Sequence, residues 1–149
     1  MDKMNGNKEK GFTLVELLAS IIILSIIIIG IFQMFIFSAK TATSNQTKLV
    51  TTHLAKATIE RVKVDAESFF PFDQITDQEK TFSKTNCHHY AGVDCDLFEV
   101  KVNDLNYEIE IRASQDDREA TLNLINVVVT VMQPDKKLSS KVEGYVVNE

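Results

Sequence analysis

Two cysteines and two histidines lie close enough in the sequence to carry chemistry together. Cys87, His88 and His89 are adjacent, and Cys95 follows Cys87 with a C-x7-C spacing. A disulfide would close a loop of nine residues and contribute about 2.5 kcal/mol on the chain-entropy estimate. The spacing favours this disulfide, with unpaired thiols as one alternative. Zinc bound with the neighbouring aspartates is another, although a C-x2-4-C spacing and a second compact ligand pair are missing.

The rest of the sequence argues against an enzyme. It contains no G-x-S-x-G, P-loop, G-x-G-x-x-G or H-E-x-x-H motif, and no D-x-[DN]-x-[DN]-G calcium loop. The net charge is −5, and residues 1–11, with three lysines and two acids, contribute +1, so the remainder carries −6. An acidic chain is poorly suited to the phosphate backbone of nucleic acids. We therefore expect no catalytic residue, cofactor, metal or nucleic-acid partner.

A long uncharged stretch dominates the N-terminal third of the sequence. Between Glu16 and Lys40 lie 23 uncharged residues, of which nine are isoleucine. As a helix they would be about 34 Å long, enough to cross a hydrocarbon core of about 30 Å. Lysines crowd the N-terminal side, which predicts a cytoplasmic N-terminus and an external C-terminal part. An oxidising exterior would let the two cysteines pair.

Two ordinary explanations of this stretch leave something unexplained. A secretory signal peptide has an apolar run of about 7 to 15 residues followed by a small-residue cleavage site. Here the run is longer and the nearest candidate site, at residues 42–44, is poor. A plain signal anchor does not explain Glu16, because a carboxylate at the edge of a membrane segment needs a partner or a route to the interface. The simplest alternative is that Glu16 only reaches the headgroups.

One motif accounts for both the glutamate and the span. The residues Gly11-Phe12-Thr13-Leu14-Val15-Glu16, followed by Leu17-Leu18-Ala19, resemble the type III signal sequence of type IV prepilins and type II secretion pseudopilins. The resemblance implies that a prepilin peptidase cuts between Gly11 and Phe12 and methylates the new amino group of Phe12. It also implies that Glu16 pairs with the amine of Phe12 in a neighbouring subunit. Where major pilins often have a helix-bending proline, this chain has Gly30 and Gln33.

The resemblance also implies partners and a location. The chain would be a structural pilin or pseudopilin subunit of a pilus, a type II secretion system or a competence filament, similar to the minor pseudopilin I and PilV-like group. Its partners would be other pilins, the prepilin peptidase, a platform membrane protein and, indirectly, an assembly ATPase. It would cross the cytoplasmic membrane once, with its head outside, and reach the cell surface in a filament. The competing interpretation is a single-pass, membrane-anchored extracytoplasmic binding protein that keeps Met1.

Beyond the span the hydrophobic period changes from helical to alternating. Residues 40–67 contain no proline or glycine and repeat their apolar positions at helical spacing, so the helix is predicted to continue to Glu67. Pro71 ends it. Alternation then predicts strands at residues 98–102, 107–111, 121–132 and 138–147, with a tight turn at Asn103-Asp104. A phase slip at Ile125-Asn126 predicts a bulge.

These features define five segments. We expect a leader at 1–11, a transmembrane helix and assembly segment at 12–39, the outer half of the helix at 40–67, a variable connecting loop at 68–96 and the sheet of a globular head at 97–149. The predicted fold class is α+β. It is type IV pilin-like, with a long N-terminal transmembrane helix packed on a C-terminal four-stranded antiparallel sheet.

Overall fold

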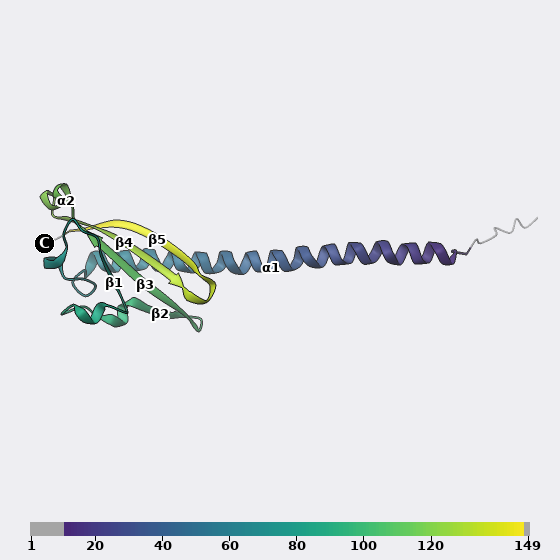
Figure 1. Ribbon diagram of the computed structural model, residues 1–149, viewed down its shortest axis with the longest axis horizontal. Helices are drawn as coiled ribbons and strands as arrows, with labels where there is room; N and C mark the ends of the chain where they lie inside the picture. Colours follow the sequence, from purple (N-terminus) through teal and green to yellow (C-terminus); the bar gives the residue numbers. More distant parts are fainter. Residues whose placement is uncertain (1–10, 148–149) are drawn as a thin grey trace, which may run out of the picture. The chain divides into compact units, whose positions relative to one another are not determined.

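The computed structural model describes residues 11–147. The predicted leader, apart from Gly11, lies outside these residues. The chain divides between Thr43 and Ser44 into two compact units, and each is described by itself. Figure 1 shows the α-helices and strands of both, with the sheet formed entirely in the C-terminal unit.

The first helix, α1, runs from Leu14 to Val64. It begins two residues later than the sequence predicts and ends three residues earlier. After Val64 the chain turns, because the Asp65 carboxylate accepts hydrogen bonds from the backbone N–H and the hydroxyl of Ser68 at 3.4 and 2.7 Å. The carbonyl of Ala66 then accepts from two further backbone N–H groups. Local hydrogen bonds of this kind compete with the helix and end it before the proline.

The sheet of the C-terminal unit has five antiparallel strands. They are β1 (Lys80–Ser83), β2 (Glu99–Val102), β3 (Leu105–Ser114), β4 (Leu124–Gln133) and β5 (Leu138–Val147). The order is β1-β3-β4-β5, and β2 also pairs with β3. Strand β3 is long enough to pair with β2 along its first half and with β1 along its second. The prediction of an antiparallel sheet is confirmed, but the number of strands is five rather than four.

The later turns of α1 pack on one face of this sheet (Figure 1). Its buried residues recur at helical spacing: Thr47, Thr51, Ala55, Thr58, Ile59 and Val62. The strands face them with alternate residues: Ile109, Ile111, Ala113, Val127, Val129, Val131 and Val146. The two periods, about 3.6 on the helix and 2 on the strands, bury one apolar face of each. The core of the head therefore lies between α1 and the sheet, as the fold class predicts.

The two hairpin turns fit their residues. Asn103 and Asp104 both have positive φ values, 51° and 61°, in the left-handed region that asparagine and aspartate tolerate and that a tight hairpin needs. This confirms the predicted turn. The β4–β5 connection is a single 3-10 turn, Pro134–Lys136, followed by Lys137 with φ of 51°.

The third predicted strand is wrong in two respects. Residues 117–121 form a short helix, α2 (Asp117–Thr121), so the strand begins at Leu124. Asp116 caps α2 through a capping box with Glu119, which the D-x-x-E pattern could have indicated. The predicted bulge is also absent among the described residues, since the β4–β5 register runs without interruption from Leu124 to Gln133. The apparent phase slip arises because the inward series begins at the buried Ile125 and continues through Val127 and Val129, whereas Leu124 lies on the other face of the strand and Leu122 precedes it.

Candidate processing and assembly site

The peptide bond between Gly11 and Phe12 precedes the helix. Residues 11–13 have no helical structure, and α1 starts at Leu14. Phe12 is 81% exposed, and nothing lies within 4 Å of the position that a Cβ atom would take on Gly11. The bond predicted to be cut is thus in irregular, exposed backbone rather than inside a helix.

Thr13 caps the start of α1. Its hydroxyl accepts a hydrogen bond from the backbone N–H of Glu16 at 3.3 Å, and its carbonyl accepts from the N–H groups of Glu16 and Leu17. Thr13 and Glu16 therefore occupy the N-cap and third helical positions, the spacing of a capping box. The partial positive charge of the helix N-terminus favours a carboxylate in this turn. The sequence analysis missed the role of Thr13, although the T-x-x-E pattern signals it.

The apolar part of α1 is exposed along its whole length. The large hydrophobic side chains between Leu17 and Phe37 are 43–77% exposed. Ser20 and Ser25 donate to the backbone carbonyls four residues before them, each at 2.7 Å. Their hydroxyls are therefore satisfied within the helix, as suits a lipid environment. By length and composition this helix fits a single-pass membrane anchor.

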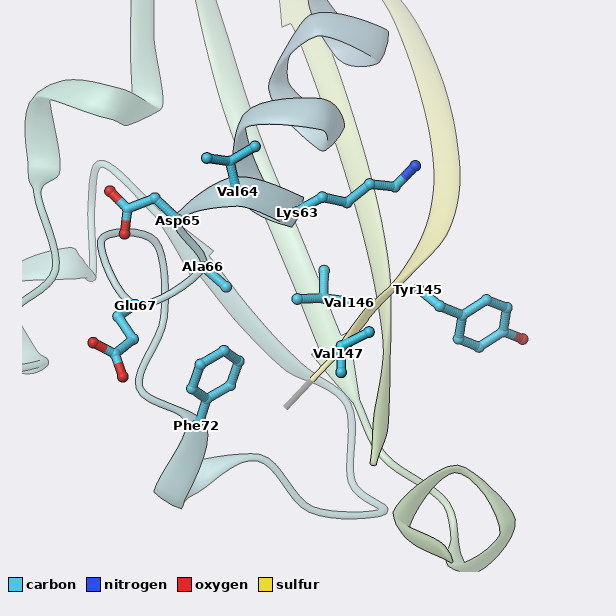
Figure 2. A pocket seen from close by; sticks show the side chains of 9 residues that line it. All are labelled: Lys63, Val64, Asp65, Ala66, Glu67, Phe72, Tyr145, Val146 and Val147. Carbon is cyan, nitrogen blue, oxygen red and sulfur yellow. The ribbon is translucent and has the colours of Figure 1, made fainter. Parts of the chain in front are cut away.

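The head carries a groove where α1 ends. Its lining residues are Lys63, Val64, Asp65, Ala66, Glu67, Phe72, Tyr145, Val146 and Val147. Figure 2 shows the acidic side chains of Asp65 and Glu67 on one side, and the apolar side chains of Phe72, Val146 and Val147 beside them. The side chains of Lys63 and Tyr145 point away on the other side. The sequence analysis did not predict this groove, because its lining comes from segments some eighty residues apart.

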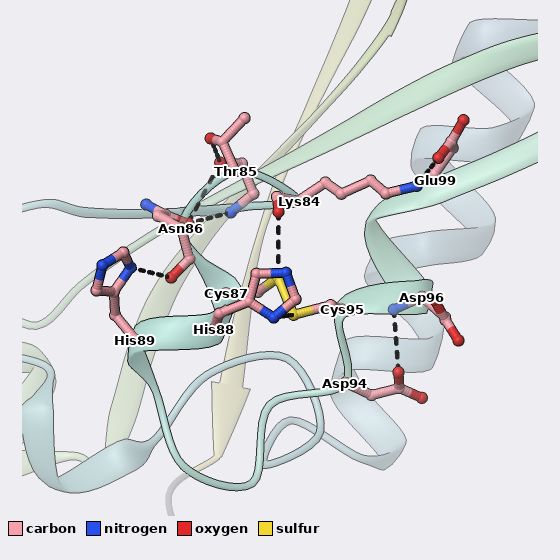
Figure 3. Close-up of a disulfide and its surroundings, with 11 residues drawn as sticks. Lys84, Thr85, Asn86, Cys87, His88, His89, Asp94, Cys95, Asp96 and Glu99 are labelled. Carbon is pink, nitrogen blue, oxygen red and sulfur yellow. Dashed lines mark hydrogen bonds and ion pairs between the residues drawn. A yellow bond between two sulfur atoms is a disulfide. The ribbon is translucent and has the colours of Figure 1, made fainter.

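The two cysteines meet in the connecting segment. The structure joins Cys87 and Cys95 in a disulfide, with their Cα atoms 5.5 Å apart (Figure 3). Cys87 is fully buried in the core, whereas Cys95 is half-buried. Phe69, Phe82 and Phe98 are buried in the same cluster. The disulfide therefore ties the connecting segment to the core of the head.

A histidine and an ion pair border the disulfide. Nδ1 of His88 lies 3.3 Å from Sγ of Cys95, and Lys84 forms an ion pair with Glu99 (Figure 3). The hydrogen bond that the Glu99 carboxylate accepts raises the pKa of the Lys84 ammonium above its usual value. Cys87, His88 and Cys95 place three ligand atoms within 4.8 Å of one another, a spacing that could hold a metal ion. In the disulfide form both sulfurs are already bonded, so this group offers no thiolate.

Of the predicted site residues, the structure brings together only the two cysteines. Within the chain, Phe12 lies just outside the helix and Glu16 in its first turn, and among residues 11–147 Glu16 makes no ion pair. A pairing of Glu16 with the Phe12 amine is a contact between two chains, and it stays a prediction.

Comparison with known proteins identifies the N-terminal segment. Residues 6–32 match a family model described as the prokaryotic N-terminal methylation motif. No curated protein and no solved structure matches this chain. The matched segment contains Gly11, Phe12 and Glu16 and ends within the apolar helix. Together with the long apolar helix and the antiparallel sheet, it supports a type IV pilin-like protein that is processed by a prepilin peptidase, a class whose members are structural subunits.

Proposed function

We propose that the chain is a pilin or pseudopilin subunit that is cleaved between Gly11 and Phe12, methylated on Phe12 and assembled into a filament. The observation that carries this proposal is the methylation motif at residues 6–32. The exposed, non-helical bond before Phe12 supports it, because a peptidase needs an extended and unhindered substrate.

Before assembly the protein is stored in the cytoplasmic membrane. The exposed apolar turns of α1 cross the bilayer, the leader remains in the cytoplasm and the head lies outside. The lysines of the leader support this orientation through the excess of positive charge on the cytoplasmic side. The disulfide in the head is consistent with an oxidising compartment.

Glu16 acts in assembly. Removal of the leader creates a cationic amine on Phe12, four residues before the Glu16 carboxylate. In lipid, a neighbouring chain whose Phe12 amine reaches Glu16 gives each charge a partner, and a chain out of register leaves both unpaired. This pairing would set the axial position of each subunit.

The finer assignment follows the same reasoning. The valine-rich β4, the turn at Pro134 and a final strand that runs to Val147 support a place in the minor pseudopilin I and PilV-like group. The partners are other pilins, the prepilin peptidase, the platform membrane protein and, indirectly, the assembly ATPase. The filament belongs to a pilus, a type II secretion system or a competence system.

The N-terminus of the mature protein tests the proposal. Methyl-phenylalanine as the first residue supports processing, and an intact Met1 supports a membrane-anchored binding protein instead. In a Gly11→Val variant the branched side chain hinders the bond, so we expect precursor that is heavier by eleven residues. Gly30→Val is the matched control, because nothing lies within 4 Å of a Cβ atom there. Normal maturation of Gly11→Val, measured by mass spectrometry, contradicts the proposed processing.

A further inference from the structure

The two ends of the head differ in charge. The strand register places the β2–β3 and β4–β5 turns at one end of the sheet, here called the turn end. The opposite end holds α2, the end of α1 and the groove, and is here called the groove end. Figure 1 shows α2 and the β4–β5 turn at these opposite ends of the head.

The turn end presents basic side chains on a fixed turn. Lys136 and Lys137 are exposed, as is Lys48, the residue that follows Thr47 on α1. Lys136 donates a hydrogen bond from Nζ to the hydroxyl of the buried Thr47 at 2.9 Å, which holds the turn against α1. The backbone N–H of Lys137 donates to the carbonyl of Pro134, but among residues 11–147 its side chain makes no hydrogen bond or ion pair, so its charge is free for a partner.

The groove end combines an acidic rim with exposed apolar surface. Glu67 and Asp65 line the groove, and four more acids lie at the same end: Asp73, Asp116, Asp117 and Glu119. Three bases lie at the same end, Arg61, Lys63 and Arg118, and Lys63 is paired with Glu60 at 2.8 Å, so the acids outnumber the bases there. Val64 is 89% exposed and Val147 55% exposed. Exposed apolar side chains that gather in a hollow with a polar rim are typical of an interaction site.

The two ends complement each other in chemistry. The turn carries an apolar residue, Pro134, and a base, Lys137. The groove offers an apolar partner in Val64 and a carboxylate in Glu67. We propose that the β4–β5 turn of one copy docks in the groove at the end of α1 of a second copy. This inference rests on the proposed function, since it names a contact between subunits of the filament. An interface that joins two different ends of one chain is heterologous, and it propagates into an open filament unless it closes into a ring.

Cross-linking between copies in intact cells tests the contact. One full-length chain carries Val64→Cys and a second, distinguishable by a tag, carries Asp135→Cys. Both positions are exposed, and the native cysteines are bonded to each other. With a short bis-maleimide we expect the mixed 64–135 product to exceed either homotypic product. Mixtures in which one of the two chains lacks its new cysteine measure the background of cross-linking.

Charge reversal makes the test specific. Lys137→Glu in the second chain should lower the mixed product roughly threefold or more, because an attractive pair at the rim becomes a repulsive one. Glu67→Lys in the first chain should then restore it. The matched control is Lys56→Glu, which makes the same change of charge at an exposed position of α1 and should leave the yield unchanged.

The outcomes separate this contact from the proposed function. Filaments that contain processed protein but give no mixed product overturn the contact and leave the function standing. If the wild-type protein is not cleaved after Gly11, the proposed function itself is wrong. If Lys137→Glu lowers binding to vesicles of anionic lipid and leaves the mixed product unchanged, the turn binds headgroups and the proposal is wrong.

Discussion

A Cβ atom added to Gly144 on β5 would lie 2.8 Å from Cδ1 of Ile59 on α1. Such a contact is closer than real Cβ atoms show, so Ile59 would have to move. Ile59 is 3% exposed in the packed core and has little free space to move into. This glycine therefore lets the side chain of Ile59 pack directly against the backbone of β5.

Replacing Gly144 should destabilise the head. Gly144→Ala should lower the free energy of unfolding by about 1–3 kcal/mol, the usual cost of overpacking, and Gly144→Val by more. Urea unfolding of the full-length protein in detergent, followed by circular dichroism of the sheet, measures the change. Lys141→Ala, at an exposed position on the same strand, is the control. Equal midpoints for Gly144→Ala and the wild type would show that Ile59 moves without cost.

A pair of hydroxyl groups, one of them buried, joins α1 to β5. Thr51 is fully buried, and its hydroxyl lies 2.7 Å from the hydroxyl of Ser140 and 2.9 Å from the carbonyl of Lys48. Thr51→Val should lower the free energy of unfolding by about 1 kcal/mol, since it removes these bonds without changing the shape of the side chain. Thr52→Val should cost less, because Thr52 is half-buried and the variant keeps the shorter, 2.7 Å contact between the hydroxyls of Thr51 and Ser140. The same urea titration decides, and a larger loss for Thr52→Val contradicts the assignment.

The disulfide should form in cells and stabilise the head. Peptide mapping without reductant should show one cross-link between Cys87 and Cys95. Its removal in a Cys87→Ala/Cys95→Ala variant should cost about 2.5 kcal/mol through the larger conformational freedom of the unfolded loop. Reduction should destabilise the wild type and leave the stability of the variant unchanged, so the variant is the control for other effects of the reductant. Two freely alkylated thiols in acid-quenched cells contradict the pairing.

The sequence predicts those parts of the fold that have strong local signals. Strand β3 alternates buried and exposed residues along its length, and Asn103-Asp104 is a strong turn signal, so this hairpin was predictable. Strand β1 was not, because it has four residues with only Phe82 buried and depends on pairing with β3, thirty residues further on. The missed strand explains why the sequence predicted four strands.

The candidate site divides in the same way. Gly11, Phe12 and Glu16 form a contiguous motif, so the sequence alone points to them. The groove depends on α1 and β5 coming together, which no local pattern encodes. Thr13 lies inside the same motif, and its cap is local, so the T-x-x-E spacing alone indicates its role.

Glu16 gives the sharpest test of assembly. It is the only charged residue between Lys10 and Lys40, and it sits in the first turn of α1. A carboxylate at the centre of a membrane helix costs about 2.5–3.5 kcal/mol on insertion scales, and less near an interface. The helix N-terminus offsets part of that cost in a single chain. Insertion therefore does not require Glu16 to be paired, whereas the proposed assembly does.

Glu16→Gln should leave processing and insertion nearly intact and strongly lower incorporation into filaments. Glutamine also suits the third position of a capping box, so the start of α1 is preserved. Without the negative charge, however, the Phe12 amine of a neighbouring chain enters lipid with no counter-ion. The mature mass and the fraction of protein in sheared filaments are measured on the same cells. Glu108→Gln, at an exposed position on β3, is the control for loss of one carboxylate. Wild-type incorporation of Glu16→Gln would mean that Glu16 only reaches the interface.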